Sequence, residues 1–188
     1  MFEKVKKFMT ASFTKDGKVD NTVRHSVRTA DWLKVLKPDA DEALLVAALA
    51  HDIERAFRTK ETYDNLKQTD KGFKDDDFLA IHQEKSAKVI SDFLKENGAD
   101  STLIERVKML VLRHEFGGNE DQNILKDADS LSFFENNIDH FFSKIMQMTN
   151  IKMIREKLDW MYDRIDSEQA KEIATPWYQD ALKKLEKL

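Results

Sequence analysis

The sequence predicts an all-α protein, and three observations carry that prediction. The 188 residues include only 5 Gly and 2 Pro, too few turn formers for a protein made of many hairpins. Apolar residues recur with helical periodicity along nearly the whole chain. Hydrophobic residues make up 41% and charged residues 35%, which is typical of a folded globular protein with a well-solvated surface.

The first elements follow from periodicity and capping signals. A short helix is expected over residues 2–10, and Asp16-Gly17-Lys18 is typical of a turn. The second helix begins near Asp20 or Asn21, either of which is suited to cap it. This helix runs to about residue 37, where Pro38 stops it.

The third helix is the most hydrophobic part of the chain. It opens at Asp39 or Asp41 and continues through Ala43–Ala50 to about Phe57. Because it is apolar on most faces, we expect it to be buried on all sides. Residues 58–77 are polar without clear periodicity, and they are expected to form a loop or a partly helical excursion. Such a segment serves either as a lid or specificity loop or as surface decoration.

The rest of the chain continues the helical pattern. Further helices are expected at residues 78–97, 101–114, 124–149 and 151–165, with one or two short ones from 167 to the end. The sequence contains no repeat and no low-complexity linker, so one domain is expected over residues 1–188. Its core would span about residues 20–150, with the N-terminal helix and the C-terminal helices packed on it.

Composition excludes several classes of function. The absence of Cys excludes disulfide scaffolds, thiolate metal sites and cysteine nucleophiles. The net charge is −4 with basic and acidic residues interspersed, so a bulk nucleic acid is not an expected partner. No apolar stretch approaches the roughly 20 residues that cross a bilayer, and no signal peptide is visible. We therefore expect a cytoplasmic protein without a membrane partner, whose oligomeric state stays open.

Four of the five histidines fall on or beside apolar helix faces. These are His25, His51, His82 and His114, and the buried carboxylates Asp52 and Asp129 are expected near them. A single histidine of this kind is more often a hydrogen-bonded core residue. Two buried carboxylates among four inward imidazoles, however, need a compensating charge, which a divalent cation supplies. The fifth, His140, has polar helix neighbours and is expected to be structural or on the surface.

The order of these residues resembles the HD-domain superfamily of metal-dependent phosphohydrolases. Residues 45–53, which end in His51-Asp52, look like the family's buried helix and its His-Asp pair. Residues 124–131 look like its last ligand segment, and this alignment selects Asp129 rather than Asp127 as the ligand. The resemblance covers about residues 21–134 and implies a single-domain orthogonal helical bundle.

The resemblance also implies a metal site. One ion would be held by His25, His51, Asp52 and Asp129, and a second by His82 and His114, with Asp52 bridging the two. The implied cofactor is one or two divalent ions of Fe, Mn, Ni, Co or Zn, with Mg as a further candidate. The Gly-Tyr-Pro signature of the cyclic-dinucleotide phosphodiesterases in this superfamily is missing after His114.

The function implied is hydrolysis of a phosphate ester of a nucleotide or related small metabolite by a metal-activated water. Asp52 and Asp129 are the expected catalytic carboxylates, and the expected substrate-binding residues are Arg55, Lys85 and Arg28. Two alternatives stay open at this point. Some relatives with the same ligands are di-iron oxygenases, and a non-catalytic module that binds a metal or a nucleotide would carry the same pattern.

Overall fold

The computed structural model describes residues 1–59, 74–146 and 151–187, and within these ranges nearly all regular structure is helical. The all-α prediction is confirmed. Helix α1 (Phe2–Ser12) leads into a small antiparallel hairpin formed by β1 (Thr14–Lys15) and β2 (Lys18–Val19). Asp16 (φ 51°) and Gly17 (φ 73°) adopt left-handed conformations between the strands, which suits a two-residue hairpin turn. The predicted turn is therefore confirmed, whereas its two short strands were not predicted.

The next two helices begin at aspartates. Asp20 caps α2 (Asn21–Leu36) and Asp41 caps α3 (Glu42–Ala50), each through a side-chain oxygen that accepts a backbone N–H. The prediction that the third helix continues to Phe57 is wrong. Helix α3 ends at Ala50, and the 3-10 helix η1 (Ile53–Phe57) follows. Nδ1 of His51 donates to the Ala48 carbonyl at 2.8 Å, so a side chain takes the acceptor that the next α-helical turn would use.

The helical arm formed by α5 (Asp76–Glu96) and α6 (Ser101–Val111) comes next. Most of the segment predicted as a loop, residues 60–73, lies outside the described residues. The prediction that the following helix reaches His114 is wrong, because α6 ends at Val111 and residues 112–116 form a turn. His114 Nδ1 donates to the Val111 carbonyl at 2.8 Å, which repeats the break seen at His51.

The helix predicted over residues 124–149 is two helices, α7 (Glu120–Asn136) and α8 (Ile138–Met146). Asn119 and Gln122 form a reciprocal capping box that begins α7 earlier than predicted. Near its end, Asn136 donates from its side chain to the Ser132 carbonyl, a local bond that competes with the helical pattern. Helices α9 (Ile151–Asp163) and α10 (Glu168–Leu185) complete the described chain.

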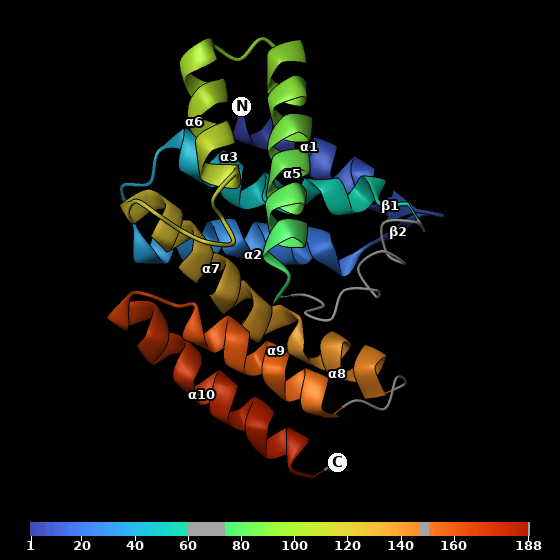
Figure 1. The fold of residues 1–188 in the computed structure, drawn as a ribbon. Helices are drawn as coiled ribbons and strands as arrows, with labels where there is room; N and C mark the ends of the chain where they lie inside the picture. Colours follow the sequence, from blue (N-terminus) through green and yellow to red (C-terminus); the bar gives the residue numbers. More distant parts are fainter. Residues whose placement is uncertain (60–73, 147–150, 188) are drawn as a thin grey trace.

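Helix α7 is the shared element of two hydrophobic clusters. Leu125 and Ala128 pack in the cluster formed with α1, α2, α3, α5 and α6, whereas Leu131 and Phe134 pack with α8, α9 and α10. Figure 1 shows α7 crossing the middle of the molecule, with α9 and α10 on one side and the α5–α6 arm on the other. Side chains on α7 can therefore contact both clusters.

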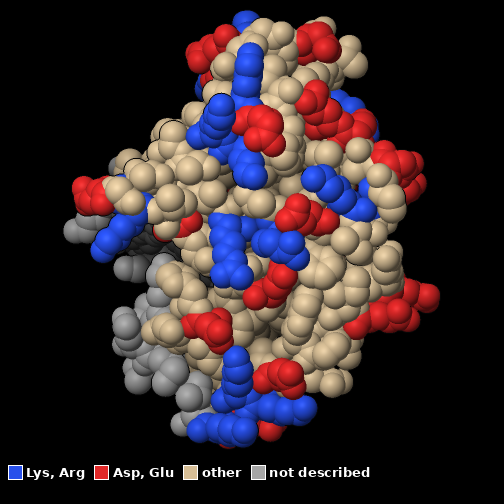
Figure 2. Space-filling view, turned by 180° about the vertical axis from the view of Figure 1, so that it is seen from behind, with Lys and Arg blue, Asp and Glu red and all other residues tan. Residues whose placement is uncertain are grey.

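The outer surface agrees with the predicted mixture of charges. On the face in Figure 2, basic and acidic side chains alternate among the residues drawn in colour. Among the described residues, no helix combines the length and apolarity that a bilayer span requires.

The carboxylate of Asp127 connects α7 to the segment between α9 and α10. The side chain is buried, and its two oxygens accept the backbone N–H groups of Asp166 at 2.8 Å and Ser167 at 2.9 Å. Both donors lie in the connection before α10. This aspartate thus ties the C-terminal helices to α7, which gives it a structural role.

Replacing Asp127 by Ala should lower the free energy of unfolding by about 2–4 kcal/mol, because two hydrogen bonds to a charged acceptor are lost. Urea denaturation followed by circular dichroism measures this loss. Asp180→Ala, an exposed position on α10, is the matched control and should change stability by less than about 0.5 kcal/mol. A comparably small change in the Asp127 variant would contradict the anchoring role.

Candidate metal centre

His51 and Asp52 occupy the break between α3 and η1, where both side chains are buried. Helix α3 is apolar on nearly all faces and is buried in the core. The residues that directly follow its end are therefore buried as well. The prediction that the helix continues here was wrong, yet the break is what lets both side chains turn towards the same space. Asp52 has φ −102° and ψ 9°, outside the regular helix.

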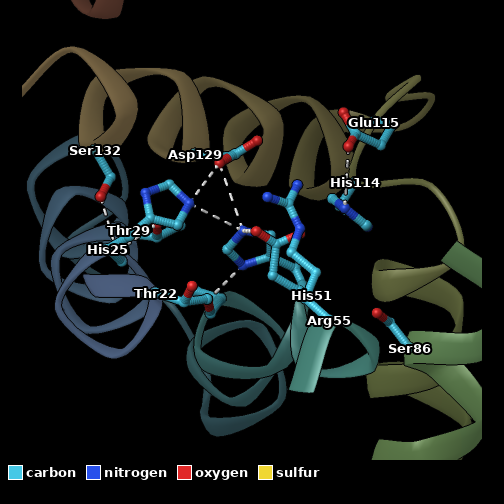
Figure 3. A network of polar contacts seen from close by, with 12 residues as sticks. Thr22, His25, Thr29, His51, Arg55, Ser86, His114, Glu115, Asp129 and Ser132 are labelled. Carbon is cyan, nitrogen blue, oxygen red and sulfur yellow. Dashed lines mark hydrogen bonds and ion pairs between the residues drawn. The ribbon is translucent and has the colours of Figure 1, made fainter. Parts of the chain in front are cut away.

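The first group of converging side chains comes from α2, the α3 break and α7. His25 Nε2 lies 3.0 Å from Asp129 Oδ1 and 3.3 Å from His51 Nε2. His51 Nε2 lies 3.5 Å from Asp129 Oδ1 and 3.6 Å from Asp52 Oδ2. Figure 3 shows the two imidazoles and the Asp129 carboxylate pointing at one another. These atoms are close enough to share one ion.

A second group shares Asp52. Its other oxygen, Oδ1, lies 3.0 Å from His82 Nε2 on α5. Ligand atoms of Asp52, His82 and His114 all lie within 4.8 Å of one another, as do those of His25, His51 and Asp52. Each group could therefore hold a metal ion, and Asp52 belongs to both.

The protonation pattern of three imidazoles leaves their inward nitrogens as acceptors. Nδ1 of His51 and of His114 faces a backbone carbonyl, and Nδ1 of His82 lies 2.6 Å from Glu54 Oε1. Each Nδ1 must carry the hydrogen, because its partner can only accept. In the neutral rings the three Nε2 atoms then present lone pairs to carboxylates. Nε2 of His82 and His114 lacks a hydrogen-bond partner among the described residues, although both atoms are buried.

The pKa shifts of the candidate ligands also indicate that a cation would be stabilised at this site. Burial alone would lower the pKa of His51, but the carboxylates of Asp52 and Asp129 outweigh burial and raise that pKa to about 9. Burial lowers the pKa of His114 to about 4. Despite their own burial, the pKa values of Asp52 and Asp129 are held well below the usual range by neighbouring cationic and hydrogen-bonding groups. The residues present therefore fit a divalent cation, whose ligands must be neutral imidazoles and ionised carboxylates.

Surrounding residues fix the ligands. Ser132 on α7 and Thr29 on α2 both donate their hydroxyls to the His25 carbonyl, at 2.7 and 2.9 Å. Arg164, directly after α9, donates to the His114 carbonyl and to Glu115 Oε2, each at 2.8 Å, and its Nη1 lies 3.3 Å from Asp129 Oδ2. The bonds to the two carbonyls hold the backbone from which the His25 and His114 rings project.

The site opens into a cavity of about 770 Å³. Its wall includes His25, Asp52, His82 and Asp129, and also six cationic side chains: Lys15, Lys18, Arg55, Arg58, Lys157 and Arg164. Arg55 forms an ion pair with Asp52, with Nε 2.8 Å from Oδ1, and its side chain is 42% exposed. Arg58 bonds to Glu54, the partner of His82. Anions entering the cavity thus meet positive charge beside the candidate metal centre.

The structure separates the three predicted substrate-binding residues. Arg55 lines the cavity, whereas Lys85 is exposed on α5 and is not part of the cavity wall. Arg28 pairs with Glu135 at 2.9 Å and with Asp31 at 3.0 Å, also away from the wall. His140, expected to be structural or on the surface, is exposed and borders the cavity. The substrate contacts of Arg55, Lys85 and Arg28 stay predictions.

Sequence reasoning missed three groups at this site. Lys157 lies on α9 and Arg164 directly follows it, both beyond the range of residues that resembles the HD-domain superfamily. Charged residues in or next to an amphipathic helix give no signal of their own. Glu115 directly follows His114, and that adjacency was the one signal available. Its role was visible only once the turn after α6 was known.

Comparison with known proteins places this geometry in context. A family model described as "Domain of unknown function (DUF4202)" matches residues 9–185. The chain also resembles a crystal structure titled as a predicted HD superfamily hydrolase from an uncultured Thermotogales bacterium. The TM-score is 0.61 at 19% identity, over 98% of this chain and 89% of the other. At that identity the likeness shows the fold, so the predicted HD-type fold is confirmed. No curated protein matches.

Metal binding at pH 7 should release about one proton. The pKa of His51 is raised to about 9, so His51 carries an extra proton at pH 7, and a cation must displace that proton to bind the ring nitrogen. The apparent affinity should rise with pH, by up to about tenfold per unit, until that pKa is passed. Isothermal titration calorimetry in buffers of different ionisation enthalpy measures the release. His140→Gln should leave it unchanged. An affinity independent of pH between about 6 and 8 would contradict the competition.

Proposed function

The chain belongs to the DUF4202 family, and we propose that it is a metal-dependent phosphohydrolase that cleaves a phosphate ester of a nucleotide or related small metabolite. The observation that carries the proposal is the convergence of buried imidazole lone pairs and ionised carboxylates at the wall of a cationic cavity. The fold neighbour is titled a hydrolase, which supports the same reaction class.

The proposed ligands are His25, His51, Asp52 and Asp129 for one ion, and Asp52, His82 and His114 for a second. Divalent Fe, Mn, Ni, Co or Zn suits this mixture of nitrogen and oxygen donors, and Mg is the weaker fit because it prefers oxygen. Such an ion, when bound, lowers the pKa of a water molecule and neutralises the charge of a phosphoryl group.

The protein groups have separate proposed roles in hydrolysis. The attacking water forms a bond to phosphorus while the ester P–O bond breaks, and the proton that the water gives up finally passes to the leaving oxygen, which departs as an alcohol. Asp52 and Asp129 line the cavity and are the proposed catalytic carboxylates that hold the centre and accept that proton. Ser132 and Thr29 keep His25 in place through its carbonyl. The reaction needs positioning and charge neutralisation more than covalent help from the protein.

Cationic side chains in the cavity would bind the substrate anion. Arg55 lies beside Asp52 and is partly exposed to the cavity, so its guanidinium can turn to a phosphate oxygen. Burial lowers the pKa of Lys157 to about 7, and an anion bound next to it would restore its positive charge. The cavity volume leaves room for more than a bare phosphate, which fits a small metabolite.

Asp52→Ala should reduce kcat/KM for the best phosphate ester by more than about 100-fold, because this carboxylate belongs to both ligand groups. The measurement is a panel of phosphate esters, nucleotides included, assayed with Mn, Fe, Co, Ni, Zn and Mg. Asp180→Ala is the control. Failure of the wild-type chain to hydrolyse any ester with metal bound would contradict the proposal, and oxygen consumption by iron-loaded protein would favour the oxygenase alternative.

Arg55→Met and Lys157→Met should each raise KM by about 10- to 100-fold with a smaller effect on kcat, because each removes a charged partner of the substrate anion. Steady-state kinetics on the best ester separates the two constants. Lys152→Met, an 86% exposed lysine on the same helix as Lys157, is the matched control. Unchanged KM values in both variants would exclude anion binding by these side chains.

A further inference from the structure

Glu115 is held in one orientation by contacts at both ends. Its backbone N–H donates to Gln83 Oε1 at 3.0 Å, which ties the turn after α6 to helix α5. Its carboxylate oxygen Oε2 accepts from Arg164 Nη1 at 2.8 Å, and the side chain is only 6% exposed. The second carboxylate oxygen, Oε1, is thereby aimed in a defined direction.

Oε1 of Glu115 faces two imidazole nitrogens that carry lone pairs when the rings are neutral. It lies 3.7 Å from His114 Nε2 and 3.9 Å from His82 Nε2. Figure 3 shows the Glu115 carboxylate directed at the His114 ring. Both nitrogens are buried and lack a hydrogen-bond partner among the described residues. Three atoms with lone pairs therefore converge, an arrangement that a cation between them would stabilise.

The second ligand group has a coordination position that this oxygen could fill. Asp52, His82 and His114 supply three ligand atoms, and a transition metal in a protein usually binds at least four, with bound water counted. Two ligand atoms that each lie about 2.0–2.2 Å from one ion are at most about 4.4 Å apart. Both distances from Glu115 Oε1 to the imidazole nitrogens fall within that limit.

We propose that Glu115 is a metal ligand of the second ion, alongside Asp52, His82 and His114, and that Arg164 is the positioning residue that holds it for this role. The proposal rests on the metal-binding half of the proposed function and not on the hydrolysis of any substrate.

Arg164 makes the assignment consistent in charge and geometry. It bonds to the oxygen of Glu115 that faces away from the imidazoles, which leaves Oε1 for the ion. The same guanidinium is the ion-pair partner of Glu115, and a carboxylate ligand must carry its negative charge. Arg164 also lies 3.3 Å from Asp129 Oδ2, so one residue directly after α9 contacts carboxylates at both ends of the candidate centre.

A purely structural role for Glu115, as the counter-ion of Arg164, makes a different prediction. In that case its loss would lower stability without changing how many ions bind. Metal stoichiometry therefore separates the two roles, and it needs no substrate.

The experiment is equilibrium dialysis of the full chain against Mn²⁺, with metal content measured by mass spectrometry. We expect two ions per chain for the wild type and one for Glu115→Gln, with the affinity for the second ion reduced by at least about 10-fold. Glu84→Gln, an exposed position two residues from His82, should keep both ions. Electron paramagnetic resonance should show spin coupling between two Mn²⁺ ions in the wild type and in the control, but not in Glu115→Gln.

Two ions in Glu115→Gln with unchanged affinity would overturn the proposal, as would a wild-type chain that binds only one. A wild-type chain that binds none would overturn the proposed function itself. If Glu115→Gln does not fold, the anomalous density of wild-type crystals loaded with Mn²⁺ decides the question. An ion within about 2.5 Å of Glu115 Oε1 supports the proposal, and a second ion more than about 3 Å from that atom contradicts it.

Discussion

The structure depends on one electrostatic constraint, which is the burial of the Asp52 carboxylate between two groups of imidazoles. One of its oxygens faces His51 and the other faces His82. A buried carboxylate is stable only with compensating positive charge or hydrogen bonds. Arg55 Nε lies 2.8 Å from Asp52 Oδ1 and supplies part of that charge, whereas the imidazole nitrogens that face the same carboxylate are lone-pair donors in their neutral state. Asp52 and Asp129 raise the pKa of His51, so a proton on His51 compensates part of their negative charge. A bound divalent cation would compensate more of it.

His51 and His114 both lie just after the end of a helix. The chain leaves helical geometry directly after α3 and again after α6, and in both places a histidine ring donates to a carbonyl three residues earlier. This hydrogen bond accompanies the end of each helix and fixes the proton on Nδ1, which leaves Nε2 to face inward.

Helix α7 and the C-terminal helices connect the site to the rest of the molecule. Two aspartates of α7 have different roles. Asp129 points at the imidazoles of the candidate metal centre, whereas Asp127 binds the connection before α10. Arg164, directly after α9, contacts Glu115 and Asp129. The resemblance to the HD-domain superfamily ended before α9 and α10, so it gave no expectation for the contacts of Arg164.

The sequence by itself determined the helical class, most element positions and the residues that converge, because periodicity, caps and residue type are local properties. The family resemblance selected Asp129 rather than Asp127 as a metal ligand; Asp129 lies beside His25 in the structure, and its ligand role stays a prediction. Sequence reasoning missed the helix breaks at His51 and Asn137, since uninterrupted apolar periodicity hides them. Only the tertiary structure decided that Glu115, Lys157 and Arg164 face the cavity. The direction of a charged side chain depends on which helices pack together, and that is a property of the whole chain.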